Sequence, residues 1–212
     1  YQKKKLPKSH RYKDEFGNIL GWNVNPINRI GIYVPGGTAS YPSSLIMTAT
    51  LAKVAGSKEL VVSTPPGTQG INPAILFTAD QLGIKEVLQV GGAQAIAALA
   101  YGTGSVKSVD KIVGPGNIFV ATAKKQVFGK VDIDMIAGPS EVLIIADTNA
   151  NPEYVAADLI AQAEHDVQAS AICLTTSVKL AKLISTQIKK QSSLLKRRDI
   201  INASIKQNGT IF

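Results

Sequence analysis

From Arg29 onward the sequence alternates between short runs rich in β-branched residues and longer alanine-rich stretches. Most of the short runs are almost continuously apolar, which is typical of strands that are covered on both faces. Strand, turn and helix repeat at a spacing that predicts an α/β fold, a mostly parallel, Rossmann-like sheet with helices on both faces. The predicted strands span 29–34, 59–63, 86–90, 111–113, 141–146 and 170–175. The predicted helices lie near 43–55, 72–82, 93–100, 118–127, 152–165 and 178–190.

Glycine- and proline-rich turns follow four of the predicted strands, at 34–37, 64–67, 90–94 and 113–117. In an open parallel sheet, ligands bind beyond the carboxyl ends of the strands, where such turns gather. Tight-turn chemistry explains any one of them alone. Three run from strand through glycine into helix and so offer backbone N–H groups at a helix start, which favours a phosphate-bearing ligand for the set.

The standard dinucleotide fingerprint is incomplete, because Gly114 and Gly116 are followed by Phe119 where a third glycine is expected. Two helix starts are marked more clearly: Asn72 and Asn151 each precede a proline, and an asparagine cap followed by proline is a strong start signal. Residue chemistry alone therefore predicts a cofactor-binding α/β protein of unspecified reaction.

The net charge of +8 invites a nucleic-acid interpretation, but its distribution argues against one. Residues 1–30 carry a net +5 and 176–212 a net +7, whereas 31–175 carry a net −4. No aromatic residues interleave with the basic run near the C-terminal end as a base-stacking platform would require. We interpret both basic ends as solvated surface and expect no nucleic-acid partner. No apolar run reaches the roughly 18–20 residues that span a bilayer, so we expect no membrane association either.

One segment carries side chains that could hold a metal. Gln162 and His165 are three residues apart and would share one face of the predicted helix. Two ligands are too few, because catalytic zinc usually takes three from the protein, so a capping or surface role stays open for the histidine. Cys173 lies in an apolar run without a basic neighbour and is expected to be a buried structural thiol. Ser140 follows Gly-Pro without the G-x-S-x-G setting of a serine hydrolase.

Six segments, in order, closely resemble the histidinol dehydrogenase family, and the match runs from about Lys8 to the C-terminus. They are GIYVPGGTASYPSS (31–44), AKVAGSKE (52–59), VGGAQAIAALAYGT (90–103), VDKIVGPGNIFVATAKK (109–125), DMIAGPSEVLIIAD (134–147) and AQAEHD (161–166). The resemblance implies a homodimeric, cytoplasmic enzyme that oxidises L-histidinol to L-histidine with two NAD+ and one zinc ion, the last step of histidine biosynthesis.

The resemblance also assigns roles to individual residues. Gln162 and His165 match the family's zinc-binding pair and lie against its substrate, as does Ser140. The family's NAD-contacting positions fall on Tyr33, Gln94 and Asn117, each in or beside a turn at a strand end. The family's glutamate–histidine pair for proton transfer has no counterpart in these residues, so we expect no catalytic residue within the chain and an incomplete zinc site.

Family members are longer at both ends, so the resemblance predicts a truncated form that is inactive alone. Residues 1–28 are expected to form a basic connecting arm, 29–137 a complete α/β unit and 138–212 the start of a second. The alternative is a non-catalytic nucleotide-binding or structural α/β remnant.

Overall fold

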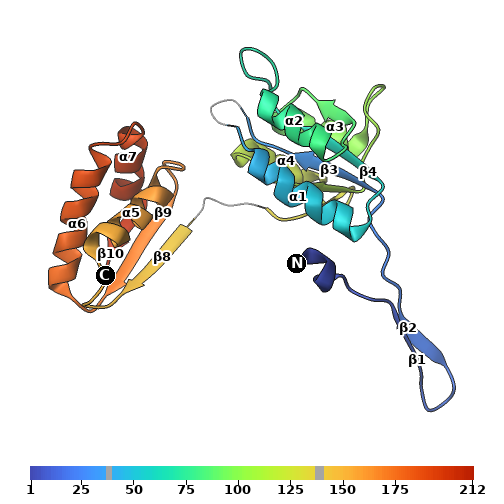
Figure 1. The fold of residues 1–212 in the computed structure, drawn as a ribbon, viewed down its shortest axis with the longest axis horizontal. Coiled ribbons are helices and arrows are strands. Elements are labelled where there is room, and N and C mark those ends of the chain that lie inside the picture. The colour runs from blue at the N-terminus through green and yellow to red at the C-terminus, as the bar shows by residue number, and fades with distance from the viewer. Residues whose placement is uncertain (37–39, 137–140) are drawn as a thin grey trace. The chain divides into compact units, whose positions relative to one another are not determined.

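The computed structural model describes residues 1–36, 40–136 and 141–212 (Figure 1). The chain divides into two compact units, Tyr1–Ala137 and Gly138–Phe212. Each unit contains a parallel sheet with helices, so the structure confirms the predicted α/β fold. Within the described ranges, no helix combines the length and apolar character needed to cross a membrane.

The first unit is built on a five-stranded parallel sheet of order β5-β4-β3-β6-β7. Its strands are β3 (Arg29–Tyr33), β4 (Glu59–Ser63), β5 (Glu86–Leu88), β6 (Lys111–Val113) and β7 (Asp132–Ile133). Its helices are α1 (Pro42–Ala55), α2 (Pro73–Gln81), α3 (Gly92–Tyr101) and α4 (Ile118–Val127). The first four strands and all four helices lie where the sequence predicted them, whereas the two-residue β7 is too short for its pattern to be seen.

Helices cover both faces of this sheet because its strands are apolar on both sides. Ile30 and Ile32 of β3 pack in one core cluster with α1 and α2. Tyr33 of the same strand packs in a second cluster with α3 and α4. Every residue of β3 is buried, as its continuous apolar run predicted.

Asparagine side chains cap the helix starts that the sequence marked. The Oδ1 atom of Asn72 accepts from the Ala74 N–H at 2.9 Å, and that of Asn151 accepts from the Glu153 N–H at 2.8 Å. The predicted caps are therefore confirmed. They satisfy backbone donors that a helix start otherwise leaves open.

The N-terminal segment, which the sequence describes only as a basic arm, contains regular structure. A 3₁₀ turn (η1, Gln2–Lys5) precedes an antiparallel hairpin of β1 (His10–Lys13) and β2 (Ile19–Trp22). Both strands are exposed along their whole length. The indole N–H of Trp22 donates to the Lys8 carbonyl at 3.1 Å and ties the hairpin to the segment before it.

The second unit has a three-stranded parallel sheet of order β10-β9-β8. Its elements are β8 (Glu141–Ala146), α5 (Pro152–Ala163), β9 (Ser170–Thr175), α6 (Val178–Ser192), α7 (Arg198–Asn208) and β10 (Gly209–Ile211). The sequence prediction located β8, β9, α5 and α6 but not α7 or β10. It also extended α5 to residue 165, two residues too far.

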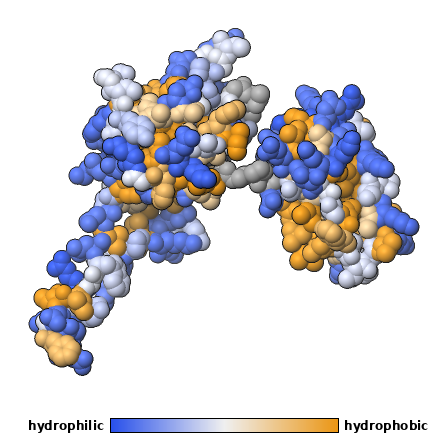
Figure 2. Space-filling view, turned by 180° about the vertical axis from the view of Figure 1, so that it is seen from behind, coloured by the Kyte–Doolittle hydropathy of each residue, from blue (hydrophilic) through white to orange (hydrophobic). Residues whose placement is uncertain are grey.

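Only one face of this second sheet is covered by the described residues. Val142 and Ile144 pack against α5 and α6. Leu143 and Ile145, which alternate with them, are 57% and 80% exposed, and Figure 2 shows extensive apolar surface on this unit. The apolar run of β8 is typical of a strand covered on both faces, but the described residues cover only one of them.

Candidate functional site

Glycine-rich turns of the first unit meet at the carboxyl edge of its sheet, where parallel strands all end. Tyr33 is the last residue of β3 and is only 4% exposed. Its hydroxyl oxygen accepts from the Gly92 N–H at 3.0 Å, which joins the end of β3 to the start of α3. The Tyr33 hydroxyl therefore lies at this edge beside the start of α3. Because its oxygen is the acceptor in this hydrogen bond, the hydroxyl proton is still able to donate to another group.

Gln94 lies in the first turn of α3 and is exposed. Gly91 occupies the N-cap position of this helix and has no side chain to cap it, while the first helical N–H, that of Gly92, already donates to the Tyr33 hydroxyl. The N–H groups that follow Gly92 in the first turn of α3 therefore offer donors and a partial positive charge to an anion. This helix start differs from the asparagine-capped starts elsewhere in the unit.

Asn117 lies at the start of α4 and is exposed, but its side chain already has a structural role. Its Oδ1 atom accepts from the Val120 N–H at 3.1 Å and caps α4. The amide nitrogen of the same side chain is the group that remains for a ligand. Of the sequence-predicted cofactor residues, Gln94 and Asn117 thus present amides at two neighbouring helix starts.

The glycines before Asn117 are required by packing. Gly114 has φ +114°, and a Cβ atom there would lie 2.1 Å from the Tyr33 carbonyl oxygen. At Gly116 a Cβ atom would lie 2.3 Å from the Val120 side chain. Tight-turn geometry therefore explains both glycines, while the turn still brings Asn117 to the edge.

A buried lysine below this turn was not recognised in the sequence. Lys124 of α4 is 2% exposed and forms an ion pair with Asp134, at the end of β7. Its Nζ atom also donates to the Gly114 carbonyl at 3.1 Å. In the sequence it is one of two adjacent lysines, and nothing there indicated which of them is buried.

The second candidate site lies at the end of α5. This helix ends at Ala163, so His165 lies beyond it. The backbone N–H of His165 donates to the backbone carbonyl of Gln162 at 3.2 Å. His165 is exposed, whereas the Nε2 atom of Gln162 is buried and has no hydrogen-bond partner among the described residues. The predicted helix thus ends two residues earlier than expected, and a turn rather than the helix carries His165.

These two residues do not form a complete zinc site. No group of three histidine, cysteine, aspartate or glutamate side chains suited to a metal occurs within the described ranges. A catalytic zinc needs one more protein ligand than this pair supplies. Ser140, the third residue that the sequence placed against the substrate, lies outside the described residues.

Cys173 is buried in β9, as predicted. Burial raises the pKa of its thiol, so this thiol is less reactive than that of a solvent-exposed cysteine. This residue contributes to the core of the second unit.

Two cavities are lined by none of the predicted site residues. One, of about 860 Å³, lies in the second unit beside α6, α7 and β10. A smaller one of about 390 Å³ lies at the carboxyl ends of β3 and β4, where Gly36, Thr64 and Asn72 line it. The smaller one lies at the edge that carries the glycine-rich turns.

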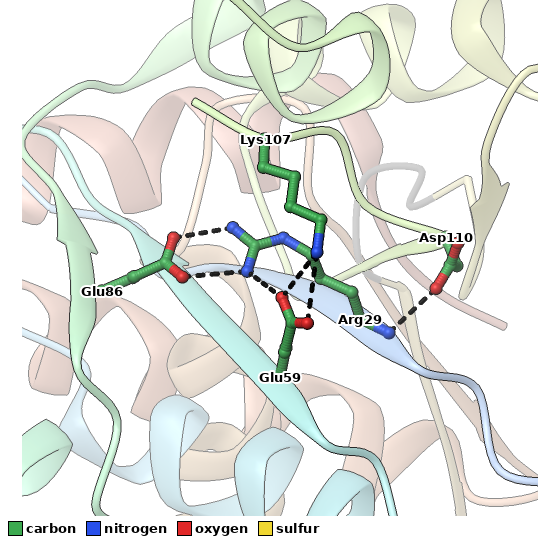
Figure 3. A network of polar contacts seen from close by, with 5 residues as sticks. All are labelled: Arg29, Glu59, Glu86, Lys107 and Asp110. Atoms are coloured by element: carbon green, nitrogen blue, oxygen red, sulfur yellow. Dashed lines mark hydrogen bonds and ion pairs between the residues drawn. The ribbon is translucent and has the colours of Figure 1, made fainter. Parts of the chain in front are cut away.

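At the opposite, amino edge of the five-stranded sheet, Arg29 forms an ion-pair network (Figure 3). Its guanidinium donates to both carboxylate oxygens of Glu86, at 2.9 and 2.6 Å, and to Glu59 at 2.7 Å. The hydrogen bond from Arg29 lowers the pKa of Glu86, and Lys107 together with Arg29 lowers that of Glu59. Because this edge is remote from the turns, we interpret the network as structural.

Comparison with known proteins identifies the family. The family model for histidinol dehydrogenase matches residues 1–212, the whole chain. The chain belongs to the histidinol dehydrogenase family. A histidinol dehydrogenase from Oceanobacillus iheyensis is 55% identical over 212 residues, and one from Listeria monocytogenes is 55% identical over 206. The match covers all of this chain and 50% of the first relative, and 96% and 48% for the second, so the chain spans about half their length.

Solved structures support the same family. Histidinol dehydrogenase from Elizabethkingia anophelis superposes with a TM-score of 0.91 and 42% identity, over 99% of this chain and 49% of that one. An NAD-dependent aldehyde dehydrogenase from Sinorhizobium meliloti superposes with a TM-score of 0.59 and 16% identity, over 91% of this chain and 38% of that one. At that identity the second likeness concerns the fold alone. The histidinol dehydrogenase family and its oxidoreductase class agree with the resemblance found in the sequence.

Proposed function

We propose that this chain carries the cofactor-binding part of an NAD-dependent histidinol dehydrogenase, which oxidises L-histidinol to L-histidine. The observation that carries the proposal is the carboxyl edge of the five-stranded sheet in a chain of this family. There the Tyr33 hydroxyl, the first turn of α3 with Gln94, and Asn117 at the start of α4 lie on neighbouring elements.

The donors at this edge suit a dinucleotide. The N–H groups that follow Gly92 in the first turn of α3 can bind a phosphate, and the side-chain amides of Gln94 and Asn117 can bind neutral polar groups. Bound NAD+ supplies the hydride acceptor of the reaction. The described residues of the chain bind and orient the cofactor. Among them, Tyr33 at the end of β3 offers its hydroxyl as a hydrogen-bond donor.

The substrate would lie against the second unit. We propose that Ser140, Gln162 and His165 contact L-histidinol, with the last two also available to zinc. The unsatisfied Nε2 atom of Gln162 supports a ligand there, because a buried amide without a partner is costly. Since two donors do not complete a zinc site, we assign no reaction step to the metal.

We further propose that these 212 residues alone do not complete the oxidation. Histidine occurs only at His10 and His165, and the former lies in the exposed hairpin. A residue pair for proton transfer and a full zinc site would have to come from polypeptide matching the rest of the relatives. We also propose that the protein forms a homodimer, as the resemblance to the family implies. The alternative is a non-catalytic α/β remnant that retains the scaffold.

Two measurements test this. Calorimetric titration with NAD+ should detect binding, and Gln94→Ala should weaken it about threefold to tenfold, the worth of one hydrogen bond. The matched control is Gln81→Ala, an exposed glutamine at the far end of α2. Absence of NAD+ binding would favour the alternative, a non-catalytic α/β remnant that retains only the scaffold.

The second measurement is NADH formation from L-histidinol, NAD+ and zinc. The 212-residue chain should give none, since it lacks a complete proton-transfer and zinc apparatus. Turnover at an ordinary enzymatic rate would contradict the proposal of inactivity while supporting that of histidinol oxidation.

A further inference from the structure

Lys124 is the largest fully buried side chain of the described residues, although it is charged. A buried ammonium is costly unless it is paired and hydrogen-bonded. Its neighbour Lys125 is exposed and has no such surroundings. The burial of one lysine of the pair therefore needs an explanation from its contacts.

Those contacts meet on a single turn residue, Gly114. The Nζ atom of Lys124 donates to the Gly114 carbonyl at 3.1 Å and pairs with Asp134 Oδ1. The other oxygen, Oδ2 of Asp134, accepts from the Gly114 N–H at 2.8 Å. Oδ1 also accepts from the Met135 N–H at 2.7 Å, which fixes the carboxylate. Both backbone polar groups of Gly114 are therefore held by one ion pair.

The opposite side of Gly114 is closed by β3. A Cβ atom at Gly114 would lie 2.1 Å from the Tyr33 carbonyl oxygen, so the turn packs closely against the end of this strand. The turn at 114–117 is thus clamped between the strand end and the Lys124–Asp134 pair. Asn117, which is exposed at the start of α4, lies three residues beyond Gly114.

We propose that Lys124 and Asp134 are positioning residues of the cofactor site, which set the position of the Gly114–Asn117 turn relative to the Tyr33 hydroxyl and α3. The inference rests on the proposed function, since it takes Asn117 as a cofactor contact. A purely structural role predicts that an apolar side chain of similar length would serve equally well, as it often does for buried ion pairs. A positioning role predicts that it would not.

The test compares Lys124→Met with Lys125→Met, the same substitution at the exposed neighbour. Calorimetry with NAD+ should show about tenfold weaker binding for Lys124→Met, since a charge-assisted hydrogen bond is lost, and no change for Lys125→Met. Hydrogen exchange at the Gly114 and Asn117 amides should accelerate only in Lys124→Met. Lys124→Arg, which keeps the charge, should restore part of the affinity.

Lys124→Met leaves Asp134 without its cation, so Lys124→Met/Asp134→Asn is measured beside it. Folded variants that match Lys125→Met in both affinity and exchange would overturn the inference. Unfolding of both would also overturn it, because the pair would then be a folding determinant only. If the unsubstituted chain does not bind NAD+, the proposed function fails, while the exchange rates still decide whether the pair holds the turn.

Discussion

The two parallel sheets of this chain are covered differently by the described residues. The sheet of the first unit lies between two helix pairs, and its central strand β3 is buried along its whole length. The sheet of the second unit is covered on one face, and on the other Leu143 and Ile145 face outward from β8. Both strands read as almost continuous apolar runs. An apolar run therefore shows that a strand is suited to cover on both faces of its sheet. The neighbouring elements decide whether both faces are covered.

The largest effect should come from the doubly covered sheet. Leu99 of α3 is fully buried and lies against Gly31 of β3, so Leu99→Ala should lower the free energy of unfolding by about 3 kcal/mol through loss of packing. Urea denaturation followed by circular dichroism measures it. Leu76→Ala is the control, because that leucine of the same unit is 44% exposed and should cost well under 1 kcal/mol. Equal losses of stability for the two substitutions would show that burial between the sheet and its helices does not decide the contribution of a leucine.

The second effect concerns the amino edge of the same sheet. Arg29 is buried between partly exposed carboxylates, so Arg29→Met should cost about 2 kcal/mol, less than for a fully buried pair. Lys107→Met provides the control, because that lysine is 66% exposed and pairs with the same Glu59. It should change stability by at most about 0.5 kcal/mol, measured in the same urea series. A loss for Lys107→Met as large as that for Arg29→Met would show that burial is not what matters.

A smaller effect should appear with pH. Arg29 lowers the folded-state pKa of Glu86 below its ordinary value of 4.5, so the pair contributes stability above that pH. The contribution is lost as the pH falls through the lowered folded-state pKa. The difference in unfolding free energy between the unsubstituted chain and Glu86→Gln should therefore narrow below about pH 4.5. A difference that stays constant down to pH 3 would rule out the ion pair as its cause.

The smallest effect on stability should come from the open face of the second sheet. Ile145 is 80% exposed, so Ile145→Thr should change the free energy of unfolding by less than about 0.5 kcal/mol. It should nevertheless reduce self-association in sedimentation velocity, because exposed apolar patches mediate association. A loss above about 1 kcal/mol would mean that this face is covered after all.

Much of the fold could be predicted from local sequence signals. Asparagine caps and apolar strand runs act within a few residues, so strands β3, β4 and β6 and the starts of α2 and α5 were located correctly. The helix α7 was missed because its sequence is polar and charged. It packs through Ile201 against Ile160 of α5, a contact between segments distant in sequence.

The candidate site was predicted less completely, because it too depends on contacts between segments that are distant in the sequence. Resemblance to the family named Tyr33, Gln94 and Asn117, and the order of strands and turns placed them near strand ends. The chain between Gln162 and His165 leaves the helix, which the apolar period of α5 did not reveal. The hydrogen bond that joins Tyr33 to Gly92 spans 59 residues and has no local signal in the sequence.

The sequence by itself determined the order of strands, turns and helices, because propensity, capping and glycine geometry act over a few residues. Only the tertiary structure distinguished Lys124 from Lys125, two identical side chains on adjacent positions of one helix. Adjacent helical positions point about 100° apart, so one lysine meets Asp134 below the turn and the other meets solvent. Side chains acquire these roles from neighbours brought together by folding, and that information is not local in the chain.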